Sequence, residues 1–492
     1  MRSRSTIALT GIALAYVNNY LNLPLSLTPT YLYTLHIYMY LTPIYLLYLI
    51  YPLPVIYMCV QLLKIRRESV VRFPSDKMKF LGELIRHFLT AVEAVSKDTS
   101  SSSSSGGGSS GGTSCITANG NGHSVSSGEV SGVEGKRYMA LELGKTLKVL
   151  SRSFLDHLQE QCKQRLVAAL DADRWVQTDA GADRQAQLDR LVSGRLYLSV
   201  SSTTPMKAQD TDRAHTGTSA SRKDSRPVSV NGAQYHVVWS CLLLCEQLVA
   251  YLDIASTLVC ISPEEAAQET VPKIVELLKL FDTRSRLLVL GAGAIQSAAR
   301  LKSISAKHLA YTAQSLGFLR ALIPHIRAAL LAVLPHSQHI LLSELERVAG
   351  DLIDHHSAIV AKLVTIAGDS IDASVSKLRS VDWERFQLPC EYFDDVVRNI
   401  SALHRVLYDC IPAELLQDIF SRIFALIARK LPTHFEEVHI DPTNPTSRQR
   451  IVEAVILLTT ALGRLKGLDP GANLVNLEAT FRRRYSVPEP EK

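Results

Sequence analysis

The sequence predicts an all-α protein made of long helices that short loops join. From about residue 136 onward, apolar residues recur at steps of three or four, which is the period of amphipathic helices. Prolines and polar residues separate these periodic segments, and we predict no β-strand, because no segment gives a convincing strand pattern with turn signals. No fixed period of about 30 to 50 residues recurs, so the pattern does not indicate a standard repeat solenoid.

Composition sets broad limits on function. At 47% hydrophobic and 20% charged over 492 residues, the chain can bury sizeable cores. A formal charge of +6 is small for this length, and no basic run is interleaved with aromatic residues, so we expect no nucleic-acid partner. The eight cysteines have irregular spacings without a CxxC pair, which indicates buried thiols rather than a disulfide framework.

Residues 1–75 form an atypical hydrophobic extension. Residues 1–67 contain no Asp or Glu, and the apolar stretch that ends near residue 63 is long enough to cross a bilayer of about 30 Å. Lys64, Arg66 and Arg67 follow this stretch, but Pro43 and two further prolines interrupt it. Two interpretations stay open, a membrane anchor and a non-native extension from a wrongly placed gene start, and we favour the second.

The next four segments alternate between helix and disorder. We predict a short helix in residues 76–97, a disordered Ser/Gly linker in 98–135, a helical segment in 136–197 and a disordered insertion in 198–232. Within the helical segment, the apolar positions from Leu143 to Leu170 predict one amphipathic helix of about eight turns.

Two bundles follow, a central one in residues 233–380 and a C-terminal one in residues 381–492. Ala233–Ser256 is predicted as a deeply packed helix, and Ser262-Pro263-Glu264 marks the start of the next, with Ser as the cap and Pro in the first turn. Further helices are expected at about 304–334, 337–378, 391–409, 413–430, 448–466 and 473–484.

The stretch LLVLGAGAIQSAAR at residues 287–300 resembles a dinucleotide-binding turn, but the rest of that site is missing. The third glycine of the fingerprint is absent, the preceding segment is helical, and no Asp or Glu occurs from Thr283 to Ser343. We therefore expect no cofactor, and interpret Gly291 and Gly293 as structural glycines at a tight helix crossing or a sharp break between helices. They should be buried or at positive φ, with no cleft above them.

Two groups of residues are candidate interaction surfaces. The acid-free stretch is basic, and its face could meet anionic lipid or an acidic partner, although its charges could also pair within the bundle. The second group is an aromatic joint near Pro389 that could either anchor the core or dock a partner. The candidate residues are Arg284, Arg286, Arg300, Lys302, Lys307, Arg320, Arg327, Trp383, Phe386, Tyr392 and Phe393.

No catalytic or metal site is expected. His336 with His339, and Asp351 with His355, are weak metal patterns that no HExxH motif or Cys/His cluster supports. No nucleophile elbow or Walker lysine occurs either.

Several blocks of the sequence resemble one family. RLVAALDADRWVQTD, the segment LLKLFDTRSRLLVLGAGAIQSAARLKSISAKHLAYTAQSLGFLRALIPHIRA, HHSAIVAKLVTIAGDSID, QLPCEYFDDVVRNISALHRVL and ALGRLKGLDPGANL are similar to successive blocks of the Vps fifty-four family. That family provides a subunit of the Golgi-associated retrograde protein (GARP) tethering complex. The resemblance covers roughly residues 138–470 and includes the LVLGAGA block.

The resemblance implies a non-enzymatic protein of stacked helical bundles that form an elongated rod. It implies transport from endosomes to the trans-Golgi network, on the cytosolic face of these membranes. The implied partners are the other GARP subunits, SNAREs, small GTPases and the endosome-derived vesicle, with no small-molecule substrate. The family's long coiled N-terminal segment has no counterpart before residue 138. The alternatives are a membrane-anchored helical scaffold and, more remotely, a nucleotide-binding enzyme that uses the Gly291–Gly293 turn.

Overall fold

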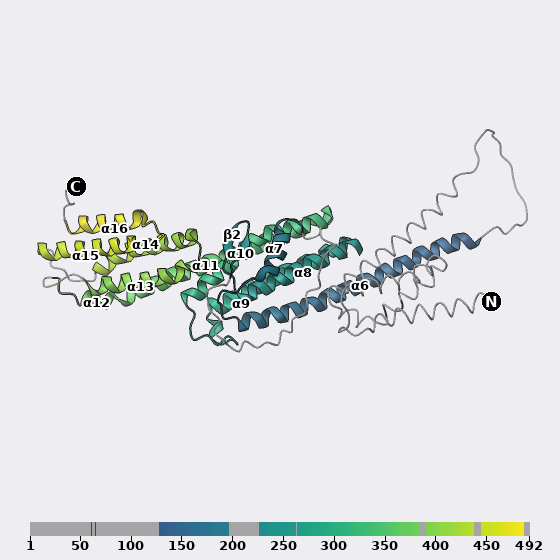
Figure 1. Cartoon of the computed structure of the whole chain (residues 1–492), viewed down its shortest axis with the longest axis horizontal. Coiled ribbons are helices and arrows are strands. Elements are labelled where there is room, and N and C mark those ends of the chain that lie inside the picture. The colour runs from purple at the N-terminus through teal and green to yellow at the C-terminus, as the bar shows by residue number, and fades with distance from the viewer. Residues whose placement is uncertain are drawn as a thin grey trace, which may run out of the picture.

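The computed structural model describes residues 127–195, 226–261, 263–383, 390–436 and 444–486, together with the isolated residues 61 and 64. In this part of the chain, helices follow one another along one long axis, so that the molecule is an elongated rod (Figure 1). The prediction of an all-α rod is confirmed. The elements are α6 (Ser127–Ala172), α7 (Gly181–Val192), β1 (Val228–Val230), β2 (Ala233–Tyr235), α8 (Trp239–Ile261), α9 (Pro263–Val289), η1 (Gly293–Ile295), α10 (Ala306–Val333), η2 (His336–Leu342), α11 (Ser343–Ala373), α12 (Val375–Arg379), α13 (Glu391–Tyr408), α14 (Ala413–Glu436), α15 (Pro445–Gly463) and α16 (Gly471–Arg484).

Helices α6, α8 and α9 pack against one another in the first part of the rod. Phe154, Leu166 and Leu170 of α6 are buried, as the predicted amphipathic stripe requires. Polar groups fix the register of the three helices, because Tyr251 Oη donates to Gln159 Oε1 at 2.7 Å and Gln159 Nε2 donates to Glu276 Oε2 at 2.7 Å. The buried side chains of Tyr251 and Gln159 thereby each have a hydrogen-bond partner on another helix.

A small hairpin corrects the expectation of disorder up to residue 232 and of a helix from Ala233. Strands β1 and β2 pair antiparallel, with Val230 opposite Ala233. Asn231 and Gly232 form the turn at φ 53° and 81°, both in the left-handed region. Asn-Gly between two short apolar runs is the strongest local hairpin signal, and here it stands at the end of a long polar insertion whose composition predicts disorder. The helix starts later, at Trp239.

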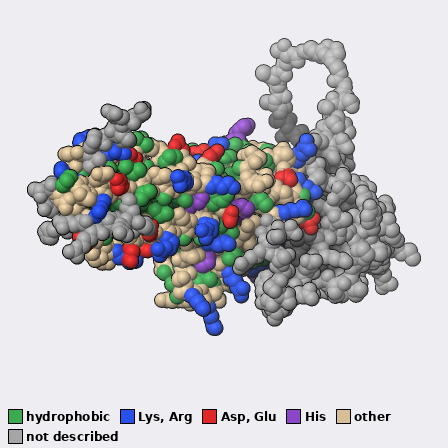
Figure 2. Space-filling model, turned by 60° about the vertical axis from the view of Figure 1, so that its left-hand side comes forward, with side chains coloured by type: hydrophobic (Ala, Val, Ile, Leu, Met, Phe, Trp, Pro, Cys, Tyr) green, Lys and Arg blue, Asp and Glu red, His purple; other side chains and the backbone are tan. Residues whose placement is uncertain are grey.

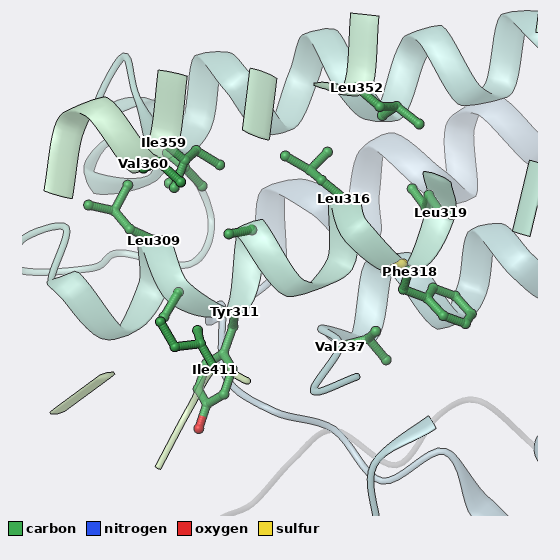
Figure 3. Packing of buried hydrophobic residues seen from close by; sticks show 14 of the residues in the cluster. Val237, Leu309, Tyr311, Leu316, Phe318, Leu319, Leu352, Ile359, Val360 and Ile411 are labelled. Carbon is green, nitrogen blue, oxygen red and sulfur yellow. The ribbon is translucent and has the colours of Figure 1, made fainter. Parts of the chain in front are cut away.

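Helix α10 lies at the centre of the core. Ser305 caps it, since its Oγ accepts from His308 N while Ser305 N donates to His308 Nδ1. In Figure 3, Leu309 and Leu316 of α10 lie beneath Leu352, Ile359 and Val360 of α11. Phe318 of α10 lies on the side of Val237, which precedes α8. This burial on several sides explains why α10 has so little polar surface.

Two described helices contain a stretch long and apolar enough to cross a membrane, namely Trp239–Ser256 within α8 and Ala306–Val333, which is α10. In the most apolar stretch of α8, 67% of the residues are buried inside the protein, and in that of α10 the share is 44%. Both helices pack against each other and against neighbouring helices, so core packing accounts for their composition. The apolar stretch before residue 63, which we considered as an anchor, lies outside the described residues.

Helix α11 connects the two ends of the rod, because it packs against α9 and α10 on one side and against α13 and α14 on the other. The predicted single helix at 337–378 is divided into η2, α11 and α12. Fully buried His355 of α11 lies 2.7 Å from Asp282 of α9 through its Nδ1 atom. Asp351 and His355 therefore do not form a metal-binding pair, because the His355 imidazole points inward to Asp282 of α9.

Helices α13 to α16 form the far end of the rod (Figure 1). Asn444 caps α15 by accepting from Thr446 N and Ser447 N, and Pro445 occupies the first turn. Helix α11 packs against α9 and α10 as well as against α13 and α14. The predicted boundary near residue 381 between a central and a C-terminal bundle therefore stays a prediction.

Candidate interaction surface

The surface with the most unusual geometry lies where α9 ends. Leu290 N and Gly291 N both donate to the carbonyl oxygen of Arg286, at 2.9 and 3.2 Å, so the last turn of the helix widens. The chain then reverses through Ala292, which has φ 56°, and enters η1. A sharp break thus separates α9 from α10.

The two glycines correct our expectation in three ways. Gly291 is exposed and Gly293 is half-buried, neither has a positive φ, and a cavity opens beside them. The residue in the left-handed region is Ala292. The reason for glycine is a close approach within the same turn, because a Cβ atom at Gly291 would lie 2.6 Å from the carbonyl oxygen of Leu287. At Gly293 the corresponding distance is 3.0 Å.

The cavity has a volume of about 680 Å³, within the range of about 300–1,000 Å³ that is usual for ligand sites. The end of α9, the loop through η1 and the end of α6 form its walls. Two of its apolar side chains remain largely exposed, Leu287 at 55% and Ile295 at 42%. Leu287 thus stays exposed, whereas Leu277, Leu278 and Leu288 of the same helix are buried.

The end of α6 holds one wall in place. The Arg284 guanidinium donates to both carboxylate oxygens of Asp171, with distances of 2.7 to 2.9 Å. Ala299 N donates to the Asp171 carbonyl oxygen at 2.8 Å. One residue of α6 thus contacts both α9 and the loop. A bidentate pair of this kind fixes orientation as well as charge.

Asp173 anchors the chain just after α6. Its carboxylate accepts from Trp175 N and from Ser240 N, each at 2.9 Å, so it serves the first turn of α8. Burial raises the pKa of this carboxyl, and the two backbone donors oppose that shift. Trp175 itself is fully buried at φ 53°.

The basic residues of the acid-free stretch do not act as one group. Arg284 pairs with Asp171, Arg286 lies 3.9 Å from Asp282, and Arg327 lies 3.4 Å from Glu346. These three candidates belong to ion pairs within the rod. On the face shown in Figure 2, Lys and Arg side chains accordingly form separate patches, with Asp and Glu between them.

Four basic candidates remain available on the surface. Lys307 lies over the ring of Tyr311, with 5.6 Å between its Nζ atom and the ring centroid. Arg300, Lys302 and Arg320 are exposed and form no ion pair with any described residue. Arg300 and Lys302 directly follow the cavity-lining residues in sequence, whereas Arg320 lies further along α10.

The aromatic joint is core rather than surface. Trp383 and Phe393 are 5% exposed and Tyr392 is fully buried. Phe435 lies among them, with its ring centroid 5.8 Å from that of Trp383 and 6.2 Å from that of Phe393. Of the two roles left open for this joint, burial supports core anchoring, because these three side chains fill the interior of the C-terminal bundle. Phe386 lies outside the described residues.

The cysteines and histidines do not form a metal site in the described part of the chain. The five cysteines whose side chains the structure describes are buried and unpaired. Cys241 and Cys245, which lie four residues apart in α8, are both buried. His336 and His339 contact each other edge to face, with 4.7 Å between ring centroids.

The sequence did not reveal three residues that shape the cavity. Asp171, Leu287 and Ile295 come from α6, α9 and η1, and only the tertiary structure brings them together. A local signal existed for Leu287 and Ile295, since both belong to the glycine-rich stretch at residues 287–300, and none existed for Asp171.

The described residues thus define an elongated helical-rod protein. Residues 232–369 match the family model described as "Vps54-like protein", a range that runs from the hairpin turn into α11 and includes the cavity loop. This part of the chain is a Vps54-like domain, and the resemblance drawn from the sequence blocks is confirmed.

Curated relatives agree with this assignment. Vacuolar protein sorting-associated protein 54 of Homo sapiens is 30% identical over 315 residues, which are 64% of this chain and 30% of the relative. The corresponding Arabidopsis thaliana protein, named chloroplastic, is 33% identical over 233 residues, or 46% of this chain and 22% of the relative. That of Drosophila melanogaster is 24% identical over 340 residues, or 68% and 32%. The chain thus spans about a third or less of the relatives it matches. No solved structure matches the chain.

Proposed function

We propose that this chain is a non-enzymatic subunit of a vesicle-tethering complex, in transport from endosomes to the trans-Golgi network. The match of residues 232–369 to the Vps54-like family carries the proposal. The names of the relatives, which are vacuolar protein sorting-associated proteins, support it. The family implies the other GARP subunits, SNAREs, small GTPases and a vesicle membrane as partners, at the cytosolic face of these organelles.

The structure fits a protein that acts through its surface. A rod holds contact points at separated places along its length, and interactions at both ends can bridge two objects. The exposed residues of the α9–α10 joint, Leu287, Ile295, Arg300 and Lys302, are the contact surface that we propose in place of the buried aromatic joint. They lie inside the family-matched range.

Relocation to a foreign organelle tests tethering directly. The full chain, fused to a mitochondrial outer-membrane anchor, should capture endosome-derived carriers on mitochondria in cultured cells, as seen by light microscopy of a retrograde cargo. Affinity purification from the same cells should recover the other GARP subunits. A folded chain that is displayed on mitochondria and collects neither carriers nor subunits would refute the proposal.

A matched pair of variants locates the surface. Ile295→Ser removes an exposed apolar side chain from the cavity, and Val475→Ser removes one that is 65% exposed on α16. We expect Ile295→Ser to reduce capture and Val475→Ser to preserve it. Equal capture by both variants would exclude the joint as the contact surface.

A further inference from the structure

The cavity beside Gly291 offers apolar contacts that nothing in the described part of the chain covers. Leu287 and Ile295 stand on two of its walls with about half of their surface in solvent. Large apolar side chains that remain together at the rim of a concave site are typical of a surface that buries a partner's side chain.

Charge around the cavity is unbalanced toward positive. Asp171 is the only acid on the walls, and Arg284 neutralises it through three hydrogen bonds. Arg300 lies two residues beyond the last lining residue, at most about 7 Å away along the chain, and Lys302 lies within about 14 Å. Both are exposed, and neither is paired with a described residue.

The end of helix α9 reduces this positive charge. The C-terminal end of α9 points its last carbonyl groups toward the loop and contributes the equivalent of about half a negative charge. Arg300 and Lys302 together contribute two positive charges, so the surroundings of the cavity stay cationic. A carboxylate near these two side chains is therefore favoured over an amine.

The walls have a fixed shape. The loop from Gly291 to Arg300 is held in the left-handed region near both ends, at Ala292 (φ 56°) and Arg300 (φ 47°). A hydrogen bond from Ala299 N to Asp171 O (2.8 Å) ties it to α6, and one from Leu301 N to Ala294 O (3.4 Å) closes the loop on itself. Backbone strain of this kind persists where the surroundings determine it, and it recurs at binding sites. A partner that binds here loses little affinity to loop ordering.

We propose that this cavity binds a short peptide segment of another protein, in which aliphatic side chains stand next to carboxylates. An aliphatic side chain enters between Leu287 and Ile295, and the neighbouring carboxylates meet Arg300 and Lys302. A concave site with apolar walls suits a protruding side chain better than the surface of a lipid bilayer. The inference deepens the proposed function and rests on it only for the premise that the chain works through surfaces.

The test is fluorescence anisotropy with the full chain and one labelled probe, fluorescein-Gly-Ser-Leu-Leu-Glu-Asp-Ser-Gly. Two matched peptides replace either the acidic pair by Lys-Lys or the leucine pair by Ser-Ser. We expect saturable binding of the probe and at least tenfold weaker binding of each matched peptide. Equal binding of the three peptides, or no saturation at 1 mM protein, would overturn the inference.

Variants assign the binding to the cavity. Ile295→Ser, and separately the double variant Arg300→Glu with Lys302→Glu, should each weaken probe binding at least tenfold. Val475→Ser and the double variant Arg405→Glu with Arg483→Glu are the controls, and they should change it less than twofold. All six exchanged side chains lie on the exposed surface, and circular dichroism verifies that each variant is folded. Loss of binding in the controls as well, or in none of the variants, contradicts the assignment.

A vesicle-binding experiment distinguishes a peptide partner from an anionic membrane. Vesicles with 30% phosphatidylserine should bind wild type and the double variant Arg300→Glu with Lys302→Glu equally. Vesicle binding that depends on these two residues, without binding of the peptide probe, would overturn the inference in favour of a membrane contact. Carrier capture on mitochondria without peptide binding would refute the peptide inference and leave the proposed function standing.

Discussion

Gly291→Ala tests the geometry of the helix break. The added Cβ atom would stand 2.6 Å from the carbonyl oxygen of Leu287, although real Cβ contacts hardly ever fall below 3.0 Å. The contact must lengthen by about 0.4 Å, and the atom that has to move is backbone at the widened last turn of α9. Overpacking of this kind costs about 1–3 kcal/mol. The lower entropy of the unfolded chain returns about 0.4–1 kcal/mol.

The expected result is a loss of about 1–2 kcal/mol in the free energy of unfolding. Gly350→Ala is the matched control, because Gly350 lies on the exposed side of α11 and an added Cβ would meet nothing within 4 Å. In a helix interior that change should stabilise the protein by about 0.5–1 kcal/mol.

Urea unfolding followed by far-ultraviolet circular dichroism measures both variants against wild type. The unfolding midpoint should fall for Gly291→Ala and rise for Gly350→Ala. If Gly291→Ala left the midpoint unchanged or raised it, the close approach to Leu287 would be wrong, and the glycine would need a different explanation.

Three further predictions concern buried groups. Asp173→Asn should remove a pH dependence of stability, because burial raises the pKa of the Asp173 carboxyl in the folded protein. The contribution of this carboxyl to stability is full below its unfolded pKa of about 4 and is lost as the pH rises through its folded pKa. The difference in unfolding free energy between wild type and Asp173→Asn should therefore shift in favour of the variant from pH 4 to pH 8, and a constant difference would contradict it. Phe435→Ala should cost about 3–5 kcal/mol by emptying the aromatic core of the C-terminal bundle, whereas Val475→Ala should stay within about 0.5 kcal/mol in the same urea titration. Cys162, whose pKa burial raises to about 11, should resist iodoacetamide at pH 8 until urea unfolds the chain, and rapid labelling of the native protein in a mass-spectrometric time course would disprove this.

The helices were predictable because their signal is local. The apolar stripe along Leu150, Phe154 and Leu166, and the proline start at Pro263, lie within a few residues of the turns they determine. The hairpin at Asn231-Gly232 carried an equally local signal. The predicted disordered insertion of residues 198–232 includes this turn and therefore hides it.

The position of charges was not predictable in the same way. The seven basic residues of the acid-free stretch look alike in the sequence, yet Arg284 is paired with an acid 113 residues earlier while Lys302 has no ion pair with a described residue. Likewise, the sequence could not decide between core and docking surface for Trp383 and Tyr392. Burial depends on which helices pack around a side chain.

The sequence by itself determined the helical class, the family and the break after α9, since periodicity, the order of the blocks and small residues are properties of the chain. The absence of the third glycine and of a nearby acid also removed the dinucleotide interpretation of LLVLGAGAIQSAAR. Only the tertiary structure decided that Gly291 avoids the Leu287 carbonyl and that Asp171 neutralises Arg284. It also revealed the open cavity between α6, α9 and η1. These features arise from contacts between segments that are distant in sequence or from the path of a turn, and a linear pattern of residue types does not record such distances.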